Sequence, residues 1–208
     1  MWIFMILCGG AAGILGMLLS KRLIKARNGE VPEKGLITGR YAPIFWAALG
    51  SAGFGLIQFL ENDSIQRAEY ASVFIICVCI AAVDFSIRKI PNSLLLSLIG
   101  TKAIFLALEF SGEALSTALW GFGAACVIFI LPSLFKIKVG AGDIKLAAIT
   151  GLYLGMYGFL QAMIIMAIAV TAYGVYLVIK RSGGFRTKTA MGPYLALGMI
   201  CTLLFPLL

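Results

Sequence analysis

Long apolar segments alternate with short polar ones along most of the chain. A helix needs about 20 residues to cross a bilayer, and eight apolar segments approach that length: 1–19, 42–60, 70–87, 92–110, 114–135, 143–156, 157–179 and 191–208. The sixth segment is short, and a GMYG turn at 155–158 is the expected boundary between it and the seventh. The pattern predicts an all-α fold, a polytopic membrane bundle of about eight transmembrane helices.

Charged residues divide the connecting segments into two kinds. Basic segments at 20–41, 88–89, 136–145 and 180–188 carry 15 of the 17 Lys and Arg residues. The other connections carry a single cation, Arg67, and are otherwise acidic, with Glu61, Asp63, Glu69 and Glu113. Because Lys and Arg concentrate in cytoplasmic loops, we expect the basic side in the cytoplasm and both termini outside, which favours an even number of spans.

Composition supports this interpretation. Hydrophobic residues make up 61% of the chain, against roughly 45–50% in soluble domains. The net charge of +8 is explained by cytoplasmic loops and indicates no nucleic-acid partner. The absence of His removes His-based metal sites, and five cysteines within apolar segments predict neither a disulfide nor a zinc site.

The whole chain, 1–208, is expected to form a single transmembrane domain. Its first part, 1–41, is interpreted as a first helix and a short cytoplasmic loop. Basic residues follow the first apolar segment instead of preceding it, so we expect a retained span and not a signal peptide. Small residues in GGAAG at 9–13, GSAGFG at 50–55 and GFGAA at 121–125 predict close contacts between helices.

Four ionisable residues fall within these spans or at their ends, and charges placed there usually mark function or a pairing partner. They are Asp84, Lys102, Glu109 and Asp143. For Lys102 we expect a structural ion pair with Glu109, two turns on, or contact with water inside the bundle.

The two aspartates are a candidate for chemistry. Asp84 lies four residues before Arg88, on the same helical face, and Asp143 opens the sixth span from the same basic side. Two carboxyls a few ångströms apart share one proton, so that one takes a proton from water while the other donates to a peptide carbonyl. That is aspartyl proteolysis, which needs no metal or nucleophilic side chain.

Other interpretations of the same residues stay open at this point. Gly140 and Gly142 could give a substrate strand close access to the chain, or Gly-Ala-Gly could be a plain loop in which Asp143 caps the next helix. The two acids could form the proton relay of a transporter, although no inverted repeat accompanies them. A non-catalytic assembly factor of a membrane complex is a third possibility.

Three blocks of sequence resemble one known family. "GAGDIKL", 140–146, resembles the Gly-x-Gly-Asp signature of type IV prepilin peptidases, which are membrane-embedded aspartic proteases. "DFSIRKIPNSL", 84–94, is similar to the family's other aspartate block, and "MGPYLALG", 191–198, is similar to its Gly-Pro-(Phe/Tyr)-Leu-Ala-x-Gly stretch. The three blocks define an expected peptidase core at about 70–200.

The resemblance implies a function and a location. The family cleaves the short basic leader from pilin-like precursors of pili, competence or secretion systems, at the cytoplasmic face of the inner membrane. Asp84 and Asp143 would be the catalytic pair, with prepilin-like proteins and the lipid bilayer as partners. No cofactor and no metal are expected for this chemistry.

Seven further residues are candidates for shaping the substrate site around that pair. Pro91 is expected to end the turn after Arg88, and Asn92 to cap the fourth span. Gly192 and Pro193 are expected to start the last helix beside the site. The remaining candidates are Gly140, Gly142 and Lys145, the last as a contact to substrate or as a snorkelling lysine.

The chain departs from the family pattern in its first basic loop. Many members carry there a larger domain with two Cys-x-x-Cys pairs that bind zinc, and they also methylate the new N-terminus with S-adenosylmethionine. "SKRLIKARNGEVPEKGLITGRY", 20–41, contains no cysteine. The resemblance therefore predicts no zinc site in this loop and leaves methyltransferase activity open.

Overall fold

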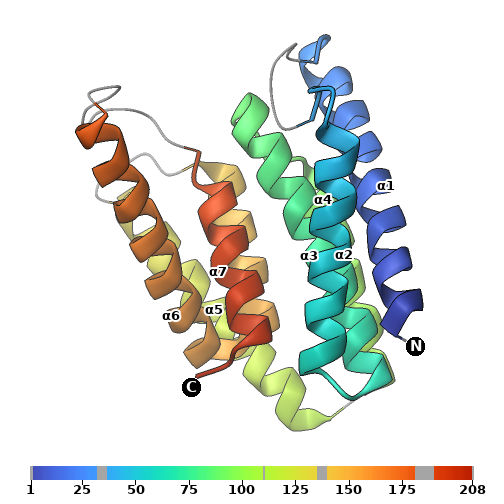
Figure 1. The fold of residues 1–208 in the computed structure, drawn as a ribbon. Coiled ribbons are helices and arrows are strands. Elements are labelled where there is room, and N and C mark those ends of the chain that lie inside the picture. The colour runs from blue at the N-terminus through green and yellow to red at the C-terminus, as the bar shows by residue number, and fades with distance from the viewer. Residues whose placement is uncertain (1, 32–36, 110, 135–139, 181–189, 208) are drawn as a thin grey trace. The chain divides into compact units, whose positions relative to one another are not determined.

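The structure, a computed structural model, describes residues 2–31, 37–109, 111–134, 140–180 and 190–207. These residues contain helices and no strands, which confirms the all-α prediction. The helices are labelled in Figure 1: α1 Trp2–Asn28, α2 Ala42–Leu60, α3 Ser64–Ile87, α4 Asn92–Leu108, α5 Gly112–Leu134, α6 Ala141–Ile179 and α7 Gly192–Leu204.

The expected eight spans are not confirmed as a count. Seven helices are assigned in the described part of the chain, and five of them are long and apolar enough to cross a membrane; α4 and α7 are apolar but shorter. The expected boundary near 155–158 does coincide with a break. Gly155 has φ 70° and ψ −175°, a non-helical conformation inside α6. The two arms of α6, 141–154 and 156–179, run in different directions (Figure 1).

The chain divides into two compact units, Met1–Ala114 and Leu115–Leu208. The first unit contains α1 to α4. Its α1 and α2 cross so closely that a Cβ atom on Gly9 would overlap the backbone of Gly50, and a Cβ atom on Gly13 would overlap the backbone of Trp46. This confirms the contact predicted from the small residues in both segments.

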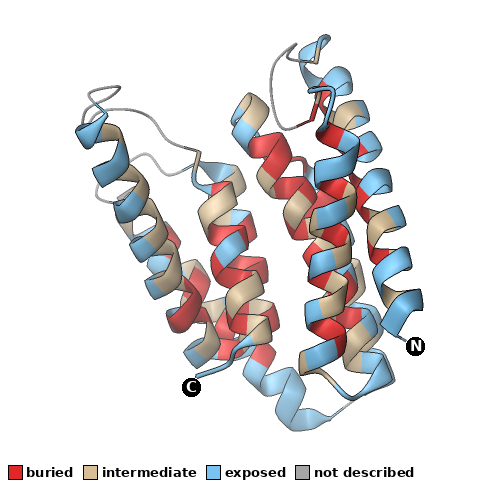
Figure 2. Cartoon of the chain, in the orientation of Figure 1, coloured by how far each residue is buried: buried red, intermediate tan, exposed pale blue. Residues whose placement is uncertain are grey.

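Helix α3 is the buried centre of the first unit. It packs against α1, α2 and α4, and Figure 2 shows buried positions along much of its length. Its contacts with the other helices run through side chains: the Sγ atom of Cys79 donates to the Gly16 carbonyl at 3.5 Å, and the Phe74 ring fills the space beside Gly53. None of the five cysteines, all of which are described, forms a disulfide.

The second unit is built from most of α5 and from α6 and α7. A Cβ atom on Gly121 of α5 would overlap the Gly151 carbonyl of α6, so these backbones touch as predicted for GFGAA. Gln161 joins the second arm of α6 to the end of α7, with its Nε2 donating to the Phe205 carbonyl at 2.7 Å and its Oε1 accepting from the Leu207 amide at 2.9 Å.

Candidate active site

Asp84 lies one turn before the end of α3 and is only 4% exposed. Its carbonyl accepts the backbone N–H of Arg88 at 2.8 Å, which closes the last turn of the helix. Arg88 itself lies outside the helix, as a C-cap with φ 52° and ψ 40°. The sequence-based expectation of a shared helical face for these two residues is therefore wrong. Residues other than Gly, Asn and Asp rarely adopt this left-handed backbone conformation.

The turn after Asp84 is fixed by contacts from two directions. Pro91 is fully buried, and its carbonyl accepts the amides of Leu94 and Leu95 at 3.1 and 3.3 Å. From α1, the Arg27 guanidinium donates to the Ile90 carbonyl at 3.2 Å. The end of α1 and the α3–α4 turn thus lie at the same end of the first unit.

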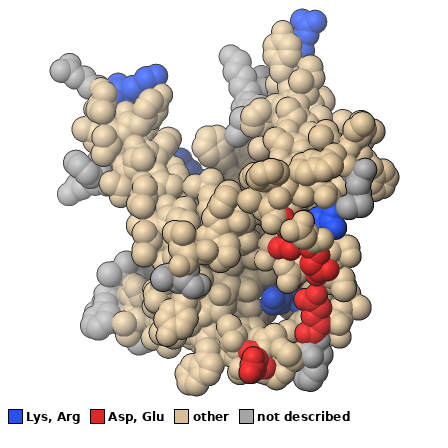
Figure 3. Space-filling view, turned by 60° about the horizontal axis from the view of Figure 1, so that its bottom comes forward, with Lys and Arg blue, Asp and Glu red and all other residues tan. Residues whose placement is uncertain are grey.

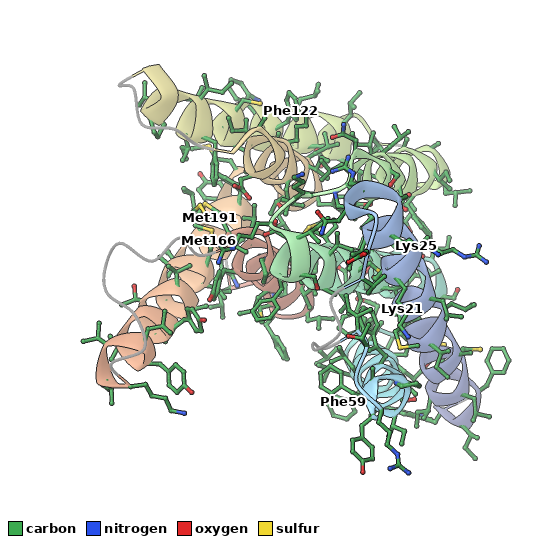
Figure 4. The ribbon with its side chains drawn as sticks, turned by 90° about the horizontal axis from the view of Figure 1, so that it is seen from above. Lys21, Lys25, Phe59, Phe122, Met166 and Met191 are labelled. Atoms are coloured by element: carbon green, nitrogen blue, oxygen red, sulfur yellow. The ribbon has the colours of Figure 1, made fainter. Side chains whose placement is uncertain are left out.

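The same end of the first unit is basic. Its described cations belong to the end of α1, to the segment before α2 and to the α3–α4 turn: Lys21, Arg22, Lys25, Arg27, Arg40, Arg88 and Lys89. Figure 4, seen from this end, shows Lys21 and Lys25 on α1. Acidic side chains gather at the opposite end, where α2 ends and α3 begins (Figure 3). Asp84 is therefore a buried acid near the basic end of its unit.

Asp143 lies in the first turn of α6 and is half-buried. The helix begins at Ala141 with Gly140 as its N-cap residue, so the alternative in which Asp143 itself caps the helix is wrong. A negative charge in the first turn is stabilised by the unpaired backbone N–H groups and by the helix dipole. The local sequence thus places a carboxylate where a helix favours one.

Gly140 is needed for space and not for an unusual backbone angle. Its φ of −64° and ψ of 131° are open to any residue, which corrects the conformational argument made for it from the sequence. A Cβ atom at this position would lie 2.6 Å from Oδ2 of Asp143. The missing side chain therefore lets the carboxylate fold back against the start of its own helix.

Gly192 and Pro193 start α7 as predicted. The Oγ1 atom of Thr150 lies 3.7 Å from the Sδ atom of Met199, which pairs the first arm of α6 with α7. Asp143 and Gly192 each lie seven residues before that contact, about 10 Å along two helical segments that run in the same direction in Figure 1. The second unit thus brings the Gly-Pro start of α7 to the level of Asp143.

The other expected site residues have the following places. Lys145 is exposed near the start of α6, and Gly142 is half-buried in its first turn. Asn92 is the first residue of α4 and exposed, while Pro91 occupies the N-cap position, so the prediction that Asn92 caps this helix is wrong. The two loop lysines before the Gly-x-Gly-Asp block, Lys136 and Lys138, lie outside the described residues.

Lys102 forms a structural ion pair, as expected, but with a different partner. Its Nζ atom lies 3.3 Å from Oε1 of Glu69 in α3, and the two side chains are 18% and 11% exposed. Glu109, the partner considered from the sequence, is exposed at the C-cap of α4. The sequence pattern places Glu69 in an outer connection. Helix α3 begins at Ser64, six residues before the predicted start of that span, and therefore contains Glu69.

Two contacts in the first unit were not anticipated from the sequence: Arg27 with Ile90, and Glu69 with Lys102. For Arg27, the sequence shows only that it belongs to a basic segment, and five other cations share that segment. For Glu69 the signal was present, since a buried lysine in a span requires a counter-charge.

Comparison with known proteins identifies the family. The type IV leader peptidase family matches residues 71–177, just over half of the chain. The chain belongs to this family. The matched segment of the leader peptidase family contains both Asp84 and Asp143, and it ends before Gly192.

Two curated relatives are similar over a larger part of the chain. They are the prepilin leader peptidase/N-methyltransferases of Burkholderia pseudomallei strains 1026b and K96243, each 27% identical over 179 residues. The alignment covers 81% of this chain and 56% of each relative, so the chain spans about half the length of these proteins. No solved structure matches the chain.

Proposed function

We propose that this protein is a prepilin leader peptidase, an aspartyl endopeptidase that uses Asp84 and Asp143 to cleave the basic leader of pilin-like precursors at the cytoplasmic face of the inner membrane. The observation that carries the proposal is the setting of the two acids. Each lies at one end of a helix, within a turn of the polar connection, and both belong to the segment that matches the peptidase family.

The charge distribution supports a common membrane surface for the two acids. Asp84 lies near the end of the first unit that carries Arg27, Arg88 and Lys89. In the second unit, the ring of Tyr173 lies 6.0 Å from that of Tyr194, which brings α6 to the start of α7 about 10 Å before the C-cap residue of α6, Lys180. Asp143 lies at the level of that start. If the basic end of each unit faces the cytoplasm, both acids lie at the same surface.

The proposed chemistry needs only these two side chains and water. A carboxylate removes a proton from the attacking water, and the partner carboxylic acid donates a proton to the carbonyl oxygen of the scissile peptide bond. Collapse of the tetrahedral intermediate breaks the C–N bond: the leaving amine takes the proton that the first carboxylate removed from water, and a hydroxyl of the intermediate returns a proton to the second carboxylate. The buried position of Asp84 limits access of bulk water to that side of the reaction.

A pilin-like substrate fits the arrangement of charge and depth. A basic leader remains at the cytoplasmic surface, while the apolar helix that follows it stays in the bilayer. The scissile bond then lies at the boundary between membrane and cytoplasm, about one helical turn deep. Asp84 has the same depth in its unit. The substrate must unwind locally there, because the peptide groups of a helix in lipid are engaged in its own hydrogen bonds.

The proposal is limited to peptidase activity. The N-methyltransferase activity in the names of the relatives is not carried over, since the chain spans only about half of their length. Asp84 and Asp143, in contrast, lie within the matched segment.

Substitution of either acid tests the proposal. Asp84→Asn and Asp143→Asn should each lower cleavage of a co-expressed prepilin-like precursor by at least about a thousandfold, because no proton can then be passed between the two groups. Glu109→Gln, an exposed acid on α4, is the matched control and should leave cleavage unchanged. Processing at a near-normal rate in either Asn variant, with normal protein levels in the membrane, contradicts the assignment.

Convergence of the two acids has a test that does not depend on activity. With the five native cysteines replaced, Asp84→Cys and Asp143→Cys should form a disulfide on mild oxidation, because a cross-link requires Cα atoms within about 7 Å. The pairs Asp84→Cys with Lys180→Cys and Asp143→Cys with Arg40→Cys serve as controls. Cross-linking of the controls but not of the acid pair argues against a shared site.

A further inference from the structure

An open cavity of about 760 Å³ lies at the surface of the first unit, far along α3 from Asp84. Helices α1, α2, α3 and α4 all contribute to its lining, and its wall along α3 extends from Ser64 to Ile76. This wall is about 18 Å long, close to the roughly 15 Å that one leaflet contributes to the hydrocarbon core. The cavity thus extends from the membrane surface at the start of α3 to the middle of the bilayer.

Most of the lining is apolar. Its charged group and its amide are at the surface end, and the deeper hydroxyls of Ser72 and Thr101 donate to carbonyls of their own helices. Phe4, Met5, Phe54 and Ile75 are among the apolar residues, whereas Arg67 and Gln58 lie where α2 ends and α3 begins. An apolar channel with a charged end has the polarity of a membrane lipid, not of a water-soluble ligand.

Arg67 is held in place by three neutral acceptors. Its Nε donates to the Asp63 carbonyl at 3.2 Å, one terminal nitrogen donates to Oε1 of Gln58 at 2.7 Å, and the other donates to the Asn62 carbonyl at 2.9 Å. No carboxylate in the described part of the chain forms an ion pair with it. Since a guanidinium has five N–H donors, two remain directed away from these partners and the charge is not neutralised.

Gln58 supplies a second donor without an acceptor. Its side chain is 8% exposed and its Oε1 accepts from Arg67, but its Nε2 group donates to no described residue. An amide N–H that lines an apolar cavity becomes costly once a lipid chain excludes water from it, unless a ligand oxygen accepts it. The ester carbonyl of a lipid, which lies between phosphate and acyl chain, is such an oxygen.

Acidic groups surround the mouth of the cavity and indicate which headgroup fits. Asp63 is exposed within one turn of Arg67, and Glu61 precedes it. Both carboxylates also bond backbone amides, Asp63 to Gln66 and Glu61 to Asn62 and Asp63, which fixes them there. A purely anionic headgroup would meet repulsion from them, whereas a phosphate with an attached ammonium group would satisfy both signs of charge.

We propose that this cavity is a binding site for a zwitterionic aminophospholipid of the phosphatidylethanolamine type. The phosphate binds Arg67, the ammonium group faces Asp63 and Glu61, an ester carbonyl accepts from Nε2 of Gln58, and an acyl chain fills the space along α3. A transmembrane helix is the other conceivable occupant. A helix in lipid satisfies its own backbone N–H and C=O groups, so it brings neither a phosphate to Arg67 nor an ester carbonyl to Gln58.

The site can be tested by lipid titration of the purified full chain in dodecyl maltoside, followed by native mass spectrometry. Dioleoylphosphatidylethanolamine should bind at least about tenfold more tightly than dioleoylglycerol, which has the same chains and no phosphate, because charge-assisted hydrogen bonds are lost. It should also bind more tightly than dioleoylphosphatidylglycerol. Equal binding of all three lipids overturns the proposal.

Variants separate the parts of the site, with helicity from circular dichroism as the folding control. Arg67→Gln should weaken phosphatidylethanolamine binding about tenfold, and Asp63→Asn, which keeps a helix cap, should reduce the preference over phosphatidylglycerol. Ala68→Trp places a ring in the cavity from the exposed side of α3 without removing an Arg67 contact, and should abolish binding. Arg40→Gln is the control and should bind normally.

Two outcomes contradict the lipid site. Unchanged lipid binding in Arg67→Gln and Ala68→Trp places the lipid elsewhere on the protein. If Ala68→Trp blocks cross-linking of a prepilin-like helix and leaves lipid binding intact, the cavity belongs to a helical partner. None of these measurements uses peptidase activity, so they stand apart from the test of Asp84 and Asp143.

Discussion

The two units hold their acids by different means. Helix α3, which carries Asp84, contains no glycine, and its neighbours make room for its side chains. Cys79 fits beside Gly16, the Phe74 ring fills the space beside Gly53, and Lys102 of α4 pairs with Glu69. The position of Asp84 therefore depends on side chains that pack and pair around a regular helix.

Helix α6, which carries Asp143, relies on glycines of its own. Gly151 touches the backbone of Gly121, Gly155 changes the helix direction, and Gly140 leaves space for the carboxylate. Its position depends on how closely backbones approach. The comparison teaches that the damaging changes in α6 are atoms added to the helix itself, whereas those in α3 are removed side chains and charges.

The largest expected effect is an added methyl group in the second unit. In Gly151→Ala, the new Cβ would overlap the Gly121 carbonyl and lie 2.8 Å from Cβ of Ala125. The two helices must separate, and we expect a loss of about 3 kcal/mol in unfolding free energy. The measurement is reversible unfolding in mixed micelles, with cleavage of a prepilin-like precursor as a second readout.

Gly174→Ala is the matched control in the same helix. Nothing lies within 4 Å of the position that its Cβ would take, so stability should be unchanged or rise by up to about 1 kcal/mol through helix propensity. If both variants lost the same unfolding free energy, α6 would be sensitive to added atoms for a reason other than its contact with α5. The comparison of the two units would then fail.

For α3, the damaging change is a removed charge. Lys102→Met leaves the Glu69 carboxylate, which is 11% exposed, without its cation. Breaking a fully buried pair costs 3–5 kcal/mol, and partial exposure reduces this to about 2 kcal/mol, measured by the same unfolding assay. The double variant with Glu69→Leu should recover most of the loss, because no unpaired charge remains. No recovery would show that Lys102 acts through another contact.

The sequence was informative where a single pattern decides the outcome. Apolar length located most helix ends to within a few residues, and the ends of α2 at Ala42 and Leu60 agree with the prediction. Small residues correctly indicated that helices approach closely at 9–13, 50–55 and 121–125, although they did not indicate which helices pair. The charge pattern anticipated the basic end of the first unit, because loops at one membrane surface share a composition.

Other features depend on three-dimensional contacts that no local pattern encodes. The Glu69–Lys102 pair joins two helices, and the apparent start of α3 at residue 70 hid Glu69 from consideration. The cap at Pro91 differs from the expected Asn92, and the cap at Gly140 excludes the open alternative of Asp143, because capping preferences are a fraction of the energy that tertiary packing provides. Arg27 was one of several equivalent cations until its contact with Ile90 was seen.

The most selective test of the comparison is Gly140→Ala, which should alter the candidate site and leave the fold intact. The added Cβ would lie 2.6 Å from Oδ2 of Asp143, the far end of a side chain that can rotate away. Stability should therefore change by less than about 0.5 kcal/mol, while displacement of the carboxylate should lower the cleavage rate about tenfold. Gly112→Ala, at the start of α5 with nothing within 4 Å, is the control and should affect neither quantity. A Gly140→Ala protein with full activity would show that the carboxylate does not need the space beside Gly140, and the second unit would then hold its acid by the helix terminus alone.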